Sequence, residues 1–297
     1  MEIDELNIPV PWGHVVVKTW GDKENEPVLV AHGIQDNAGF FDYLIPHLPK
    51  CFYYICIDLP GHGMSSHFPP FLPIHVMDYV YVFKIVLDYL SRSRYTIIGH
   101  SFGGQISLLF SHLYPEYVVK LVLIDVLYFS SLQIDEIRPV FEKIIDLNNF
   151  QKQPPVYTLN EILNKATVNR RTSQLPIDVC NTVLQRSLIQ IGEDQFKIST
   201  DPRLKSIMKT FMTEEIVIKL LKVYPMRCPV LIILSSESIL PHIYSERFLN
   251  TILGEMKKNK MFTFKEIEGN HDCHVTKPKE VSKLITDFLI INESSKL

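Results

Sequence analysis

One stretch of the chain decides its fold: Tyr95-Thr96-Ile97-Ile98-Gly99-His100-Ser101-Phe102-Gly103-Gly104. It begins as an apolar, β-branched run that is typical of a buried strand. After Gly99 the pattern changes, and residues 105–110 have the apolar spacing of a helix. The Gly-x-Ser-x-Gly between the two patterns predicts a tight strand-to-helix turn that presents the hydroxyl of Ser101.

Strand and helix patterns alternate on both sides of this turn. Alternating or continuous apolar runs predict further strands at 13–20, 27–32, 52–58, 120–125, 229–234 and 262–267. Amphipathic segments predict helices at 40–48, 74–90 and 278–290. This alternation predicts an α/β fold, with a mostly parallel central sheet flanked by helices.

The alternation stops between Val126 and Arg227. That stretch has a mostly helical pattern, lacks a convincing buried strand and is interrupted by prolines. The sequence therefore predicts a core domain built from residues 1–125 and 228–297. Residues 126–227 are predicted to form a helical lid inserted after the sixth strand.

Bulk properties exclude several classes of protein. The 297 residues carry a formal net charge of −3 and no basic stripe, which argues against a nucleic-acid partner. The five cysteines form no Cys-x-x-Cys pair, which argues against a structural metal site. No apolar run is long enough to predict a membrane span.

The printed sequence ends in Ser295-Lys296-Leu297. A terminal Ser-Lys-Leu is an address read by the peroxisomal import receptor. The tripeptide predicts a peroxisomal protein, with the cytoplasm as the alternative.

A serine nucleophile requires a base and two N–H donors for an oxyanion. His271 is the best base, because it follows the last predicted strand and comes after Ser101 in the chain. His274 is the reserve candidate. The predicted oxyanion donors are the backbone N–H groups of Phe102, which follows the serine, and Ile34, which follows the strand 27–32.

The acid that orients the histidine is left open by the sequence. Its usual place, after the strand 229–234, holds Ser238, which cannot carry the negative charge that stabilises an imidazolium. Asp125, at the end of the strand 120–125, and Glu237 are the two alternatives, and a site without an acid is the third. Asp36 and Asp58 are predicted to have structural roles in the loops around the site.

These motifs together resemble the α/β-hydrolase fold proteins. Within that superfamily the chain is similar to the serine hydrolase-like proteins, the branch that includes the insect kraken protein. The segments that carry the resemblance span nearly the whole chain: Pro11-Trp12-Gly13-His14, His32-Gly33-Ile34-Gln35-Asp36-Asn37-Ala38, Asp58-Leu59-Pro60-Gly61-His62-Gly63, Gly99-His100-Ser101-Phe102-Gly103, Asp201-Pro202-Arg203-Leu204 and Gly269-Asn270-His271. The resemblance implies a serine nucleophile and no defined substrate, and Ser238 departs from the superfamily pattern.

The expected chemistry is hydrolysis of a small-molecule carboxylic ester or thioester through an acyl-enzyme on Ser101. A peroxisomal address makes lipid or acyl-CoA-type substrates plausible. No metal or organic cofactor is required for this chemistry. Two alternatives stay open: a ligand-binding protein with impaired catalysis, and an acyltransferase in which an alcohol replaces water.

Overall fold

The structure is a computed structural model that describes residues 1–70, 73–129, 134–147, 155–167, 175–207, 212–238 and 240–290. The tripeptide Ser295-Lys296-Leu297 lies outside these ranges, so peroxisomal import stays a prediction. Within these ranges, no helix has both the length and the apolar character that crossing a membrane demands.

Eight strands form one sheet, in the order β1-β2-β4-β3-β5-β6-β9-β10. Their bounds are β1 (Ile3–Val10), β2 (Gly13–Trp20), β3 (Glu26–Ala31), β4 (Phe52–Ile57), β5 (Tyr95–His100), β6 (Val118–Ile124), β9 (Val230–Ser235) and β10 (Phe262–Ile267). Strand β2 runs antiparallel to β1 and β4, and the other neighbouring pairs are parallel. The prediction of an α/β fold with a mostly parallel sheet is confirmed.

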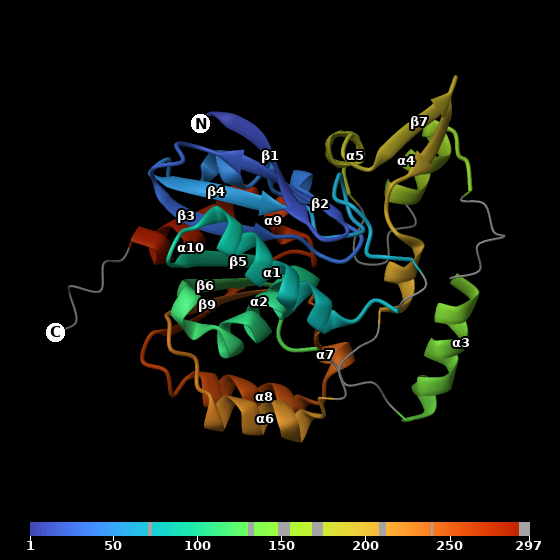
Figure 1. The fold of residues 1–297 in the computed structure, drawn as a ribbon. Helices are drawn as coiled ribbons and strands as arrows, with labels where there is room; N and C mark the ends of the chain where they lie inside the picture. Colours follow the sequence, from blue (N-terminus) through green and yellow to red (C-terminus); the bar gives the residue numbers. More distant parts are fainter. Residues whose placement is uncertain are drawn as a thin grey trace.

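Helices cover both faces of this sheet (Figure 1). The helices that follow or flank its strands are α1 (Val76–Leu90), α2 (Ser101–Leu113), α6 (Glu214–Val223), α7 (Leu240–Ile243), α8 (Glu246–Met256), α9 (Cys273–Thr276) and α10 (Pro278–Ile290). Successive side chains of a strand point to opposite faces. Accordingly Ile97 of β5 packs with α1, α2 and α8, whereas Ile98 packs with α10 on the other side.

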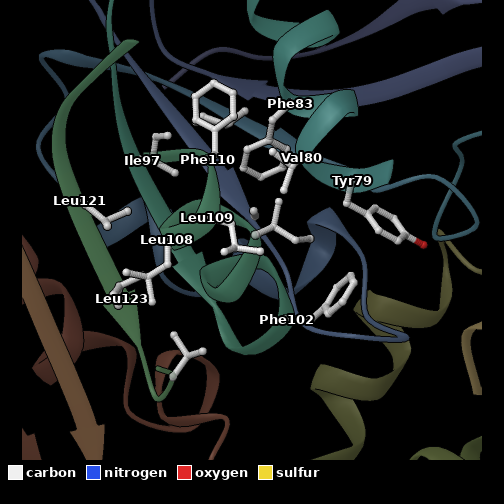
Figure 2. Close-up of a cluster of buried hydrophobic side chains, with 14 of the residues drawn as sticks. Tyr79, Val80, Phe83, Ile97, Phe102, Leu108, Leu109, Phe110, Leu121 and Leu123 are labelled. Carbon is white, nitrogen blue, oxygen red and sulfur yellow. The ribbon is translucent and has the colours of Figure 1, made fainter. Parts of the chain in front are cut away.

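The layer formed by α1 and α2 is built on aromatic side chains (Figure 2). Phe83 of α1 and Phe110 of α2 lie with ring centroids 5.9 Å apart. Tyr79 of α1 meets Phe102, the residue after Ser101, edge-on at 5.1 Å. The start of α2 is thus fixed by packing as well as by the strand that leads into it.

The chain leaves the sheet after β6 and returns to it at β9. The intervening segment contains α3 (Ile137–Leu147), α4 (Leu159–Thr167), α5 (Ile177–Leu184) and a hairpin of β7 (Leu188–Gly192) and β8 (Gln195–Ile198). Figure 1 shows these elements grouped beside one end of the sheet. Helix α6 belongs to the same segment but packs against α8 and buries Val217 and Leu221 in the core. The division into core and lid stays a prediction.

Two local expectations fail. The predicted helix over 40–48 is wrong: the structure has two short 3₁₀ turns, Ala38–Phe41 and Ile45–His47. Pro46 explains the break, because a proline lacks the N–H that a continuous helix needs there. Strand β1 was not predicted, since Pro9 and an irregular apolar spacing obscure its period of two.

Candidate active site

The predicted turn at Ser101 is present between β5 and α2. Ser101 is half-buried and has a φ of 48°, a strained value for a residue with a side chain. The two glycines of the motif permit this geometry. A Cβ on Gly99 would lie 2.5 Å from Gly104 Cα, and one on Gly103 would lie 2.5 Å from the Ala31 carbonyl oxygen. Strand and helix therefore touch where the serine is presented.

Asp125 and His271 form a buried pair. Asp125 follows β6 with a φ of 47°, and its Oδ2 lies 2.6 Å from His271 Nδ1. Its Oδ1 accepts hydrogen bonds of 2.9 Å from both the N–H and the hydroxyl of Ser235. Because a carboxylate only accepts, His271 Nδ1 carries the proton and Nε2 keeps its lone pair. The pair has the geometry of a general base held by an acid.

Glu237 has a different environment. It lies in the exposed turn after β9, where its backbone N–H donates to the Gly269 carbonyl. Ser238, at the usual place of the acid, accepts a hydrogen bond from the Leu240 N–H. Of the two carboxylates considered, the structure brings Asp125 to His271.

The loop after β3 lies against Ser101. A Cβ on Gly33 would approach Ser101 Cβ to 3.3 Å and His100 Nδ1 to 3.1 Å. The Gly103 N–H donates to the His32 carbonyl at 3.0 Å and ties this loop to α2. Phe102 lies in the first turn of α2, where backbone N–H groups have no intrahelical acceptor. Loop and helix start are thus adjacent, as an oxyanion site formed by Ile34 and Phe102 requires.

Two buried histidines, His100 and His274, form a stack next to His271. His100 Nε2 donates to the His271 carbonyl at 3.0 Å, and the rings of His100 and His274 pack with centroids 4.1 Å apart. Burial, with the nearby His271, lowers the pKa of His100 to about 4, so this imidazole is neutral near pH 7. His274, the reserve base, is fully buried against Phe41, whereas His271 holds the contact to Asp125.

His100, Asp272 and His274 also offer possible ligand atoms within 4.8 Å of one another. His100 Nε2 lies 3.9 Å from Asp272 Oδ1 and donates its proton to the His271 carbonyl, so Nδ1 is the nitrogen of this ring that keeps a lone pair. We interpret this group as a support for His271, whose carbonyl His100 contacts.

Sequence reasoning did not single out Arg186. It follows α5 and forms a buried ion pair with Asp58, Nη2 to Oδ2 being 2.7 Å. The signal that could have pointed to it is Asp58 itself, a fully buried carboxylate that needs a cation or several donors.

Comparison with known proteins identifies the family and the fold. Residues 26–190 match the family model described as "alpha/beta hydrolase fold". Human serine hydrolase-like protein 2 is 33% identical over 301 residues, covering 97% of this chain and 94% of that protein. Two solved structures are similar in fold. The hypothetical protein PA1622 from Pseudomonas aeruginosa PAO1 has a TM-score of 0.83, 23% identity and coverage of 97% and 99%. The thioesterase domain from the curacin biosynthetic pathway has a TM-score of 0.79 and 16% identity, and the match covers 96% of this chain and 99% of that domain.

Proposed function

Because the chain belongs to the α/β hydrolase fold family and, within it, to the serine hydrolase-like proteins, we propose that it cleaves carboxylic esters or thioesters through an acyl-enzyme on Ser101. One observation carries the proposal. His271 is held by Asp125 at 2.6 Å, and its carbonyl contacts His100, the residue that precedes the serine on the strained turn.

In this mechanism His271 Nε2 takes the proton of the Ser101 hydroxyl as Oγ attacks the acyl carbon. The Ile34 and Phe102 N–H groups bind the oxyanion, and Asp125 stabilises the imidazolium without becoming protonated. His271 then gives the proton to the departing alcohol or thiol. Water, activated by the same nitrogen, hydrolyses the acyl-enzyme and regenerates Ser101.

The ligand-binding alternative rested on Ser238 standing where an acid is usual. A carboxylate in contact with His271 removes that motive, so the hydrolase is the better proposal. An acyltransferase would share every residue named above. Product analysis with added alcohol separates it from a hydrolase, because only a transferase yields mostly the new ester.

The test is covalent labelling with a fluorophosphonate, which reacts with activated serines. Mass spectrometry should locate a rapid adduct on Ser101, and Ser101→Ala should remain unlabelled. Folded protein that forms no adduct, with the site open to the reagent, would contradict the proposal. An adduct would direct the search for substrates to esters and acyl-CoA thioesters.

We also propose peroxisomal import through Ser295-Lys296-Leu297, supported by the tripeptide alone. A fluorescent protein fused ahead of Met1 should collect in peroxisomes. The same fusion without residues 295–297 should stay in the cytoplasm. Identical distributions of the two fusions would reject the proposal.

A further inference from the structure

The segment that begins with α5 is fastened to the loop after β3. Asn37, in that loop, donates through Nδ2 to the Val183 carbonyl at 2.9 Å and to the Ser187 hydroxyl at 2.8 Å. Phe40 packs against Val179 of α5 in a separate buried cluster. These contacts join two parts of the chain that lie about 140 residues apart in sequence.

Arg186 reinforces this junction with charge. Its side chain is 8% exposed and that of Asp58 is fully buried, and both Nε and Nη2 of Arg186 donate to Asp58 Oδ2. The outer nitrogen, Nη1, contacts Glu5 near the surface. Asp58 in turn holds two backbone segments. Its Oδ1 accepts the Ala38 N–H at 2.7 Å, and its Oδ2 accepts the Met64 N–H at 3.0 Å.

A single turn of the chain connects Ala38 to Ile34, whose N–H is the predicted oxyanion donor. The Asp36 N–H donates to the Gly33 carbonyl at 3.2 Å, and His32 Nδ1 donates to the same oxygen at 2.7 Å. That carbonyl belongs to the peptide group that carries the Ile34 N–H. In a planar trans peptide the two bonds point in opposite directions. Holding the carbonyl therefore fixes the direction of the Ile34 N–H.

We propose that Arg186 is a positioning residue for the oxyanion hole, acting through Asp58 on the loop 33–38. The inference rests on the proposed serine hydrolase function. It makes the segment from α5 to Ser187 a fixed brace of the site. An opening of this segment would have to separate a buried ion pair, which is unfavourable because it leaves Asp58 without its cation.

The proposal predicts a defect in turnover more than in substrate binding. An oxyanion donor acts on charge that develops in the transition state, so a misplaced donor lowers kcat with little change in KM. With p-nitrophenyl acetate as substrate, Arg186→Met should lower kcat about 10- to 100-fold, with KM within about threefold of wild type. Arg186→Lys, which keeps the charge, should recover part of the loss.

Two comparisons separate positioning from general destabilisation. If Arg186 acts through Asp58, adding Arg186→Met to Asp58→Asn should lower kcat no further. Glu5→Gln is the matched control, since it removes the charge of the outer partner of Arg186 and leaves the ion pair with Asp58. Its kcat should equal that of wild type. All rates are compared per folded molecule at a temperature well below each variant's Tm.

A lower Tm for Arg186→Met with unchanged kcat would overturn the proposal, as would fully additive losses in the double variant. If Arg186→Met fails to fold, Arg186→Lys tests the proposal instead, and its kcat should fall by a smaller factor. Wild-type protein that neither turns over the ester nor reacts with a fluorophosphonate would instead reject the hydrolase function itself. If the wild-type protein reacts with the fluorophosphonate but does not turn over the ester, the same variants are compared by their rates of labelling.

Discussion

Asp125 connects three strand ends through one carboxylate. One oxygen binds His271, after β10, and the other binds the N–H and hydroxyl of Ser235, at the end of β9. The backbone N–H of Asp125 donates to the Ile233 carbonyl of β9 at 2.7 Å. A carboxylate held by so many contacts has little freedom to turn away from the histidine. In the proposed mechanism the acid thus follows β6, and not the neighbouring strand β9, after which Ser238 holds the usual place.

Asp125→Asn should lower kcat by about 10³- to 10⁴-fold. The new amide keeps the shape of the side chain but presents its NH₂ to His271 Nδ1. That contact favours the tautomer with the proton on Nε2, which cannot accept the serine proton. Initial rates on an ester, with circular dichroism to confirm folding, measure the effect. Glu237→Gln is the matched control and should retain the wild-type rate, whereas equal rates for both variants would remove Asp125 from the mechanism.

Residue types led to Ser101 as the proposed nucleophile and His271 as the proposed base, but left the partner of the base open between Asp125 and Glu237. Asp125 and His271 are 146 positions apart, and no local pattern reports which carboxylate the fold brings to a histidine. Arg186 was missed for the same reason, since its role depends on an ion pair with Asp58, 128 positions away. Long-range pairs of this kind depend on the packing of whole elements and carry no periodicity.

At the scale of elements, the contact between β3, β5 and α2 sets the geometry of the site. Gly103 is the closest point of this contact: a Cβ there would lie 2.5 Å from the Ala31 carbonyl oxygen and 2.6 Å from that of His32. Both neighbours are backbone atoms of the sheet and its following loop. They cannot move aside without disturbing the oxyanion loop.

Gly103→Ala should therefore destabilise the fold by about 3 kcal/mol, the upper end for overpacked positions. Gly254→Ala in α8 is the matched control, because nothing lies within 4 Å of the added Cβ. This exchange should instead stabilise the protein by up to about 1 kcal/mol, since alanine is the better helix former. Urea unfolding of the two variants measures both effects. A Gly103→Ala protein as stable as wild type would show that strand and helix are not in contact.

The pattern of elements was predictable where apolar residues recur with a clear period or form an unbroken run. Strands β2 and β10 and helix α10 have the predicted bounds, and the other buried strands differ by one or two residues at their ends. The predictions of secondary structure fail where tertiary contacts determine the local conformation. Segment 38–47 has apolar side chains buried below β3 and β4, which resemble a helical face in sequence, yet Asn37 and Pro46 divide it into turns.

At the scale of the whole molecule, packing around the site buries several histidines in neutral form. Burial lowers the pKa of His32 and of His62 to about 3, and lowers that of His100 to about 4. His32 is further fixed as a neutral ring, because its Nε2 accepts the Leu59 N–H while Nδ1 donates to Gly33. In the unfolded chain the same groups titrate near their ordinary value of about 6.5.

These pKa values predict that acid weakens the fold well above the range in which most carboxylates titrate. Below about pH 6.5 these histidines bind protons in the unfolded chain but stay neutral in the folded protein. The free energy of unfolding must therefore fall as the pH falls. Each of the three histidines contributes up to about 1.4 kcal/mol per pH unit, in a window from about pH 6.5 down to its folded pKa. Urea unfolding between about pH 7 and pH 5 gives the slope, and His62→Gln should reduce it by the contribution of one histidine, up to about 1.4 kcal/mol per pH unit. A free energy of unfolding that is constant over this range would mean that these rings gain protons in the folded state, and with them charge beside the oxyanion loop.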